Sequence, residues 1–382
     1  MEEIAIYLHW PFCKSKCPYC DFASIRQNDA SLYEKFEDLL LLDLTRSISE
    51  IGDRRIKSVF FGGGTPSLMN PKSIEKILNF LIKKFSMTNE AEITLEANPD
   101  TFCRNKMKDF KNAGINRASL GVQSFFDKNL RFLSRSYGEK QSVAAAEIVA
   151  QTFENFSFDF IYGYEGQTVK NFAQDLERAV NFECKHISCY QLTFEENTPF
   201  YEKMLAGVIK KIDENKEIEL YDYIEDFLEN NNIFRYESSN YSMAGFESRH
   251  NLAYWKYEDY LGVGPSAHSR VVVDKRKTEM VKISDPFLWE SALSQNRSTF
   301  SHINTLSEKE KLEEMIIMGL RMVNGVTMED LYQKVSPRVV NEIISEKKLK
   351  FLTEKKLMAN GKIQLTKSGL KKMNSAVKFL LS

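Results

Sequence analysis

The sequence predicts an α/β protein, a partial (β/α)6 barrel followed by a small, mostly helical C-terminal domain of the winged-helix type. Six short apolar runs alternate with amphipathic stretches at a repeat of about 30–35 residues, which is typical of βαβ units and a parallel sheet. Six units are too few to close an eight-stranded barrel. After about residue 284 the alternation gives way to helical patterns rich in lysine and glutamate.

The six predicted strands share a core of aliphatic, aromatic and β-branched residues. They are Ile4–His9, Ser58–Phe61, Ile93–Ala97, Arg117–Gln123, Phe156–Tyr162 and Ile187–Thr193. Between the first two strands, Leu32, Phe36 and Leu40 recur on one helical face, as expected of a helix that packs on a sheet. Reactive groups of parallel βα folds gather at the carboxyl ends of the strands. The residues that follow each strand are therefore the candidates for a functional site.

We expect three segments along the chain. Residues 1–235 form the barrel core, residues 236–283 extend it, and residues 284–382 form the C-terminal domain. Trp289 and the polar run Ser294–Thr299 predict a connector at the start of the last segment, and the pattern over Leu306–Met322 predicts the helix that follows it.

Composition argues against several classes of function. Lys and Arg number 52 against 53 Asp and Glu, so no overall positive field favours nucleic acid. No apolar run approaches the ~18–20 residues that span a bilayer, and the N-terminus lacks the pattern of a signal peptide. Six cysteines, three of them clustered, do not make a disulfide framework. We expect a cytoplasmic protein. The sequence leaves open a homodimer and a peripheral contact with a membrane.

Three cysteines follow the first predicted strand at intervals of four and three residues: Cys13, Cys17 and Cys20. Thiolates are the usual protein ligands of iron–sulfur clusters. Three of them can hold three irons of a cubane and leave the fourth iron open to a small molecule. The alternatives are a zinc site that lacks one ligand and cysteines that only pack. Structural zinc sites use four protein ligands, commonly in paired C-x-x-C form, and the chain has no second pair, so the spacing favours the cluster.

This C-x-x-x-C-x-x-C spacing, with Tyr19 before the last cysteine, resembles the motif of the radical S-adenosylmethionine superfamily. In that family the amino and carboxylate groups of S-adenosylmethionine bind the open iron, and an electron from the cluster cleaves the sulfonium. The resemblance implies a 4Fe-4S cluster held by Cys13, Cys17 and Cys20, S-adenosylmethionine as cofactor, and a partial barrel of the TIM type. The remaining cysteines, Cys103, Cys184 and Cys189, are expected to be packing residues.

A run of three glycines follows the second predicted strand and leads into Thr65 and Pro66. Glycine allows the backbone to approach a ligand closely and to adopt positive φ. Taken alone, this run is equally consistent with an ordinary βα turn. Beside the cysteine motif it resembles the glycine-rich motif of the family, which contacts the methionine amino group. The resemblance therefore assigns Gly63, Gly64 and Thr65 to the cofactor site.

Further polar residues fall where the coproporphyrinogen-oxidase-like branch of the family places its S-adenosylmethionine contacts. They are Tyr7, Tyr19, Glu96, Gln123, Arg135 and Asp159. A carboxylate at Glu96 suits the ribose hydroxyls, although a structural salt bridge would also explain it. The planar fork of Arg135 suits the cofactor carboxylate. Asp159 lies inside an apolar strand, where a polar group needs a partner or a ligand.

His250 opens the motif His-Asn-x-x-Tyr-Trp in a segment dense with aromatic residues. Histidine is a common axial ligand of heme iron, and aromatic rings pack on porphyrin faces. From chemistry alone, a histidine that caps a packed loop is the more ordinary interpretation. The motif nevertheless matches, at every fixed position, the signature of the branch that comprises heme chaperones. The resemblance implies that His250 contributes to heme binding and that the protein passes heme to apoproteins such as respiratory heme proteins.

The alternative within the same family is an oxygen-independent coproporphyrinogen III oxidase, which decarboxylates two propionates by radical hydrogen abstraction. That branch carries a further cysteine two positions after the third one, and Phe22 stands there in this sequence. It also has an N-terminal extension ahead of the first strand, whereas the first strand here begins within a few residues of Met1. Both departures favour the heme chaperone, and we expect no coproporphyrinogen oxidase activity.

Overall fold

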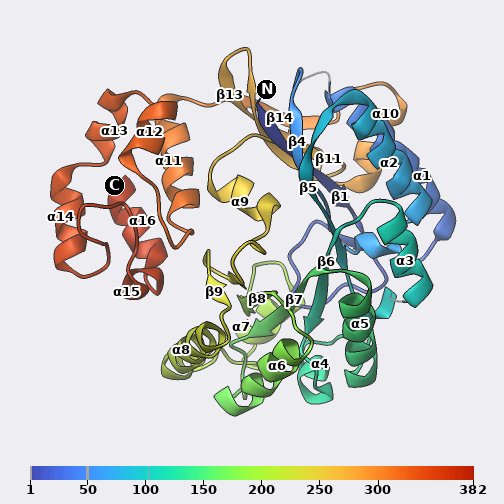
Figure 1. Cartoon of the computed structure of the whole chain (residues 1–382), viewed down its shortest axis with the longest axis horizontal. Coiled ribbons are helices and arrows are strands. Elements are labelled where there is room, and N and C mark those ends of the chain that lie inside the picture. The colour runs from blue at the N-terminus through green and yellow to red at the C-terminus, as the bar shows by residue number, and fades with distance from the viewer. Residues whose placement is uncertain (1, 49–50, 102) are drawn as a thin grey trace.

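The computed structural model describes residues 2–48, 51–101 and 103–382 and is built on one twelve-stranded mixed sheet (Figure 1). Six parallel neighbours make up the centre of this sheet. They are β1 (Glu3–Trp10), β4 (Arg55–Gly63), β5 (Ser86–Ala97), β6 (Arg117–Gln123), β7 (Asn155–Tyr162) and β8 (His186–Gln191). The six predicted strands are confirmed. The sheet has two free ends, at β14 and β9, so it forms the predicted partial barrel.

Helices connect the parallel strands and cover the outer face of the sheet. They are α1 (Ala30–Ser47), α2 (Pro71–Lys84), α3 (Arg104–Asn112), α4 (Asp127–Phe132), α5 (Glu139–Thr152), α6 (Val169–Asn181), α7 (Pro199–Leu205) and α8 (Glu214–Asn230). Figure 1 shows α1, α2 and α3 together on one side of the sheet. Among the described residues, no helix is long and apolar enough to cross a membrane.

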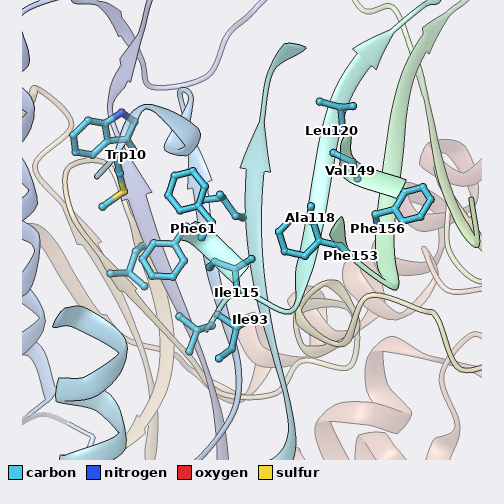
Figure 2. Packing of buried hydrophobic residues seen from close by; sticks show 14 of the residues in the cluster. Trp10, Phe61, Ile93, Ile115, Ala118, Leu120, Val149, Phe153 and Phe156 are labelled. Atoms are coloured by element: carbon cyan, nitrogen blue, oxygen red, sulfur yellow. The ribbon is translucent and has the colours of Figure 1, made fainter. Parts of the chain in front are cut away.

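Alternation along each strand separates an apolar outer face from a polar inner face. In β6, Ala118, Leu120 and Val122 belong to the main hydrophobic core, whereas Arg117 and Ser119 point to the other face. The same core holds outward residues of neighbouring strands, such as Trp10, Phe61 and Ile93, which Figure 2 shows from close by. Helices therefore anchor the sheet from outside, and the inside of the barrel is left for polar groups.

Short strands extend the sheet at both edges. On the β1 side these are β11 (Tyr260–Val263), which is parallel to β1, and the antiparallel strands β12 (His268–Val273), β13 (Arg276–Lys282) and β14 (Phe300–Thr305). Beyond β8 lie β10 (Asn240–Ser242) and β9 (Phe234–Arg235). The sequence did not predict these six strands. They are short, and β14 is largely exposed, so they carry little hydrophobic periodicity.

The expected connector is confirmed for residues 295–299, which join α10 (Pro286–Ser294) to β14, and is wrong for Trp289. Trp289 lies within α10 and is fully buried, with its ring centroid 5.8 Å from that of Phe36. A buried tryptophan contributes a large apolar surface to the core. Residues 284–305 therefore pack with the main sheet.

The C-terminal region is helical and has a hydrophobic core of its own. Its helices are α11 (Glu308–Gly319), α12 (Met328–Lys334), α13 (Pro337–Ile343), α14 (Glu346–Glu354), α15 (Lys367–Leu370) and α16 (Met373–Leu381). Residues 362–366, which lie between α14 and α15, form only isolated antiparallel bridges, among them Met358 with Leu365. Figure 1 shows these helices, orange to red, as a group apart from the barrel. The predicted boundaries at residues 235 and 283 stay predictions.

A buried ion pair fastens the antiparallel extension to helix α1. Lys282 Nζ lies 2.8 Å from Asp43 Oδ1, and each side chain is only 1% exposed. The same carboxylate accepts hydrogen bonds from the Gly264 N–H at 2.9 Å and the Thr299 hydroxyl at 3.1 Å. Asp43 thus joins α1, the turn after β11, and the segment that enters β14.

Removing this carboxylate should destabilise the fold. We expect Asp43→Ala to lower the free energy of unfolding by ~3–5 kcal/mol, because Lys282 would be left as a buried charge without its counter-ion. Urea denaturation measures this loss. Asp38→Ala, at an exposed position of the same helix, is the matched control and should change stability by less than about 0.5 kcal/mol. Equal effects of the two substitutions would contradict the assignment.

Candidate functional site

The cysteine loop leaves the carboxyl end of β1 and is closed at its base by a small two-stranded sheet. Its strands, β2 (Phe12–Cys13) and β3 (Ile25–Arg26), pair in parallel on either side of the loop. His9, the penultimate residue of β1, places its Nε2 2.8 Å from the Ala23 carbonyl oxygen. Because a carbonyl only accepts, His9 carries its proton on Nε2 and accepts from the Tyr7 hydroxyl at Nδ1 (3.1 Å). His9 therefore clamps the returning end of the loop.

A continuous chain of hydrogen bonds joins two of the loop cysteines through residues that follow β4, β5 and helix α4. The Thr65 hydroxyl donates to Cys13 Sγ (3.4 Å), and Asn98 Nδ2 donates to Thr65 Oγ1 (3.0 Å). Arg135 Nη2 donates to Asn98 Oδ1 (2.9 Å), and Arg135 Nη1 donates to Cys17 Sγ (2.8 Å). This chain, from Cys13 through Thr65, Asn98 and Arg135 to Cys17, is called the sulfur arc below. It gives the sulfurs of Cys13 and Cys17 one hydrogen-bond donor each, which stabilises their thiolates.

The donor set of the loop suits an iron–sulfur cluster. Cys13, Cys17 and Cys20 are partly exposed and free of disulfides. Burial raises the pKa of the Cys13 thiol and raises that of Cys20 to about 11. The positive charge of bound iron reverses this preference and favours the thiolates. In the described part of the chain no three His, Cys, Asp or Glu side chains converge on one metal ion. A cubane does not require such convergence, because each thiolate binds a different iron.

The glycine run lies directly against the cysteine loop. A Cβ at Gly64 would lie 2.6 Å from the Phe12 carbonyl oxygen, and Gly63 has a φ of +110°, which favours glycine. A Cβ at Gly63 would also lie 2.7 Å from the His9 ring. The glycines are thus required for the packing of the loop, whatever ligand the turn contacts.

Glu96 and Asp159 face each other across the inside of the barrel mouth. Burial and the charge of Asp159 raise the pKa of Glu96 to about 8. A hydrogen bond from the Gly63 N–H (3.1 Å) lowers this pKa, but by less than burial raises it. Asp159 accepts hydrogen bonds from the hydroxyls of Ser119 (2.8 Å) and Ser157 (2.9 Å). At neutral pH Glu96 is therefore largely protonated and able to donate a hydrogen bond as well as accept one.

The other predicted contacts border the same mouth. Gln123 ends β6 with a φ of +63°, an uncommon conformation for a residue with a side chain. Tyr19 packs on Phe200 with ring centroids 5.9 Å apart, and its buried hydroxyl has no hydrogen-bond partner among the described residues. Tyr7 lies beside Glu96, whose charge helps to raise the tyrosine pKa further after burial. The structure thus brings the predicted cofactor residues to one end of the barrel.

His250 lies on helix α9 (Arg249–Trp255), deeper in the barrel than the cysteine loop, and its ring centroid is 6.3 Å from that of Tyr7. Its Nδ1 lies 2.9 Å from Ser58 Oγ and its Nε2 lies 2.8 Å from the Tyr254 hydroxyl. The ring stacks on Phe60 with centroids 4.9 Å apart, and burial lowers the pKa of His250 to about 3. Both ring nitrogens of this neutral imidazole are therefore engaged within the protein. A contribution of His250 to heme binding stays a prediction.

Glu92 of β5 fixes this helix from inside the barrel. Its carboxylate accepts hydrogen bonds from the backbone N–H groups of Arg249 and His250, each at 3.1 Å, and from the Ser248 hydroxyl at 3.3 Å. A carboxylate at the start of a helix satisfies amides that have no partner within the helix. The position of His250 is thus set by a strand about 150 residues earlier in the chain.

Sequence reasoning missed three residues of the site. Asn98 bridges the sulfur arc, His9 clamps the cysteine loop, and Tyr137 accepts from Arg135 Nε at 2.8 Å. Asn98 follows Glu96 by two positions, so its place at a strand end was a usable signal. The expectation that all three remaining cysteines pack was wrong for Cys103, which is exposed, and holds for the buried Cys184 and Cys189.

Glu96→Gln should remove a pH-dependent cost of folding. Because the folded pKa is raised from 4.5 to about 8, native Glu96 binds more protons than the unfolded chain in this window, and stability falls as the pH rises. In the cluster-free protein we expect the variant to gain stability relative to wild type between pH 5 and pH 8, by up to ~1.4 kcal/mol per pH unit. Urea unfolding at each pH measures the gain, and Glu75→Gln on exposed α2 is the control. A pH-independent difference would refute this.

His250→Ala should weaken the fold, because Ser58 and Tyr254 would lose a hydrogen-bond partner and Phe60 its stacked ring. We expect a loss of ~2–4 kcal/mol in the free energy of unfolding. His302→Ala removes an exposed imidazole and should cost less than about 0.5 kcal/mol. If both variants unfold at the same urea concentration, the structural role assigned to His250 is wrong.

Comparison with known proteins agrees with this geometry. Residues 7–179 match the Radical SAM superfamily, and residues 306–371 match the HemN C-terminal domain. The whole chain is similar in fold to coproporphyrinogen III oxidase (HemN) from Escherichia coli, with a TM-score of 0.84 and 19% identity over 91% of that chain.

Two curated relatives extend over nearly the whole length of the chain. Heme chaperone HemW of Buchnera aphidicola subsp. Schizaphis graminum is 35% identical over 100% of this chain and 99% of its own. Heme chaperone HemW of Bacillus subtilis is 30% identical over 95% of each chain. The chain belongs to the HemW family of radical S-adenosylmethionine proteins.

Proposed function

We propose that this protein is a heme chaperone, which binds heme and transfers it to apoproteins in the cytoplasm. The observation that carries the proposal is the full-length likeness to relatives named heme chaperone HemW. The residue at position 22 supports it. Phe22 is 59% exposed at the end of the cysteine loop, where the oxidase branch has a further cysteine.

The cysteine loop would hold the 4Fe-4S cluster, and the barrel mouth would hold S-adenosylmethionine. When bound, the cluster supplies an open iron for the amino and carboxylate groups of the cofactor and a source of one electron. The residues proposed for the cofactor are Tyr7, Tyr19, Gly63, Gly64, Thr65, Glu96, Gln123, Arg135 and Asp159. Glu96, protonated at neutral pH, would donate to or accept from a ribose hydroxyl. Arg135 already holds Cys17 and Asn98, so its contact with the cofactor carboxylate would come in addition to these bonds.

For His250 we propose an indirect contribution to heme binding. Its nitrogens are engaged with Ser58 and Tyr254, so its effect would pass through the aromatic wall that it supports, formed by Phe60 and Tyr254. The recipients would be heme-dependent apoproteins such as respiratory heme proteins.

An anaerobic experiment separates the proposal from the oxidase alternative. Cluster-reconstituted protein is given S-adenosylmethionine, an electron donor and coproporphyrinogen III in one sample, and hemin in another. We expect stoichiometric heme retention, transfer of the Soret band to a heme-free apocytochrome, and no protoporphyrinogen IX. The variant with Cys13, Cys17 and Cys20 all replaced by alanine is the control that separates cluster iron from heme iron. Steady formation of protoporphyrinogen IX would identify an oxidase, and absence of both product and heme would reject both functions.

A further inference from the structure

The five histidines of the chain differ sharply in whether their ring nitrogens are available. Three are buried, and both nitrogens of each are engaged. These are His9 with Ala23 and Tyr7, His186 with Ser157 and Tyr236, and His250 with Ser58 and Tyr254. None of these three offers a lone pair to a ligand in this structure.

The other two histidines stand on one face of the antiparallel extension. His268 is paired with Val281 across β12 and β13, and Val281 is paired with His302 across β13 and β14. Directly opposed residues of neighbouring strands share a face, so His268, Val281 and His302 form one row. His302 places its Nε2 3.7 Å from the Glu279 carboxylate. The exposed ring of His268 has no hydrogen-bond partner among the described residues.

His268 also lies at the end of the sheet that carries the cysteine loop. It follows the turn that leaves β11, and β11 is parallel to β1. This turn packs on β1 just before the loop, since a Cβ at Gly264 would lie 2.6 Å from the His9 carbonyl oxygen. His268 is close enough to His9 for its charge to lower the His9 pKa. The available imidazole is therefore a neighbour of the proposed cluster site.

The surroundings of His268 keep its imidazole neutral and place aromatic side chains beside it, which suits the binding of a flat aromatic molecule. Partial burial and the charge of Arg270 lower the pKa of His268, so its ring keeps a free lone pair at neutral pH. Arg270, two residues along the same face, is held by Glu314 and Glu279, and Tyr260 pairs with it across β11 and β12. Tyr260 meets Tyr254 of the His-Asn-x-x-Tyr-Trp motif edge to face, with ring centroids 4.5 Å apart. Arg270, Tyr260 and Tyr254 thus form a row of contacts from the strand of His268 to the helix that carries His250.

We propose that His268, and not His250, is the residue of this chain that binds heme iron as an axial ligand. The ligand class is an iron porphyrin with at least one open axial position, which an exposed imidazole binds through nitrogen. The inference rests on the proposed function, because it names the iron contact of the heme that the chaperone would carry. On this assignment, the His-Asn-x-x-Tyr-Trp motif supports the tyrosines beside this face and does not bind the iron.

Hemin titration of the cluster-reconstituted full-length protein tests the proposal. The Soret band gives affinity, and resonance Raman spectra give the iron–imidazole signature. We expect His268→Ala to weaken hemin binding about tenfold or more and to lose this signature. Free imidazole should restore the signature in His268→Ala. His302→Ala, two strands away in the same row, is the matched control and should behave as wild type.

The outcomes are distinguishable. An unchanged spectrum and affinity in His268→Ala, or loss of the signature in His302→Ala, would overturn the assignment while leaving the chaperone proposal intact. Wild-type protein that retains no hemin would instead reject the chaperone proposal itself. Because His268 is exposed, its substitution should leave the urea midpoint unchanged, and this measurement confirms that the variants are folded.

Discussion

The polar inner face of the partial barrel is the constraint on which the rest of the structure depends. Buried polar groups are costly unless they are hydrogen-bonded, and this sheet turns carboxylates, imidazoles, hydroxyls and a guanidinium toward its interior. Glu92, for example, is 5% exposed and accepts hydrogen bonds from the backbone N–H groups of Arg249 and His250. Each such group needs a partner from another element. The interior thereby fixes the positions of segments that hydrophobic packing alone would leave free.

Helix α9 illustrates this dependence. It is only seven residues long, too short to be stable alone. Glu92 accepts hydrogen bonds at its start, Ser58 meets His250, and Phe60 stacks on the imidazole. The helix that carries the His-Asn-x-x-Tyr-Trp motif thus also closes one end of the barrel interior. His250 has a role in packing that also bears on the proposed heme site. It helps to close the barrel, and it holds Tyr254, which packs on Tyr260 beside the antiparallel extension.

At the opposite end of the barrel, polar side chains from several elements likewise fix a short segment, here the cysteine loop. The sulfur arc brings residues that follow β4, β5 and α4 to the cysteine loop, so the loop is held by side chains and by the small β2–β3 sheet together. Protein ligands held by such outer partners are oriented before a cluster binds. The antiparallel extension joins this end through Gly264 and is fastened to α1 by Asp43 and Lys282. A face with two histidines therefore stands in a fixed relation to the cysteines.

The sequence by itself determined the parallel core and the cysteine loop. Both are local patterns: apolar runs that alternate with helical periodicity, and three cysteines within eight residues, each readable without knowing what lies elsewhere. Tertiary structure decided the sheet edges, the burial of Trp289, the bridging role of Asn98 and the difference between His250 and His268. The periodicity of short, half-exposed strands is weak, and the partners of a buried group come from distant parts of the chain. Whether a histidine is a ligand or a packing residue depends on which hydroxyls and carbonyls reach its two nitrogens, and only folding brings these together.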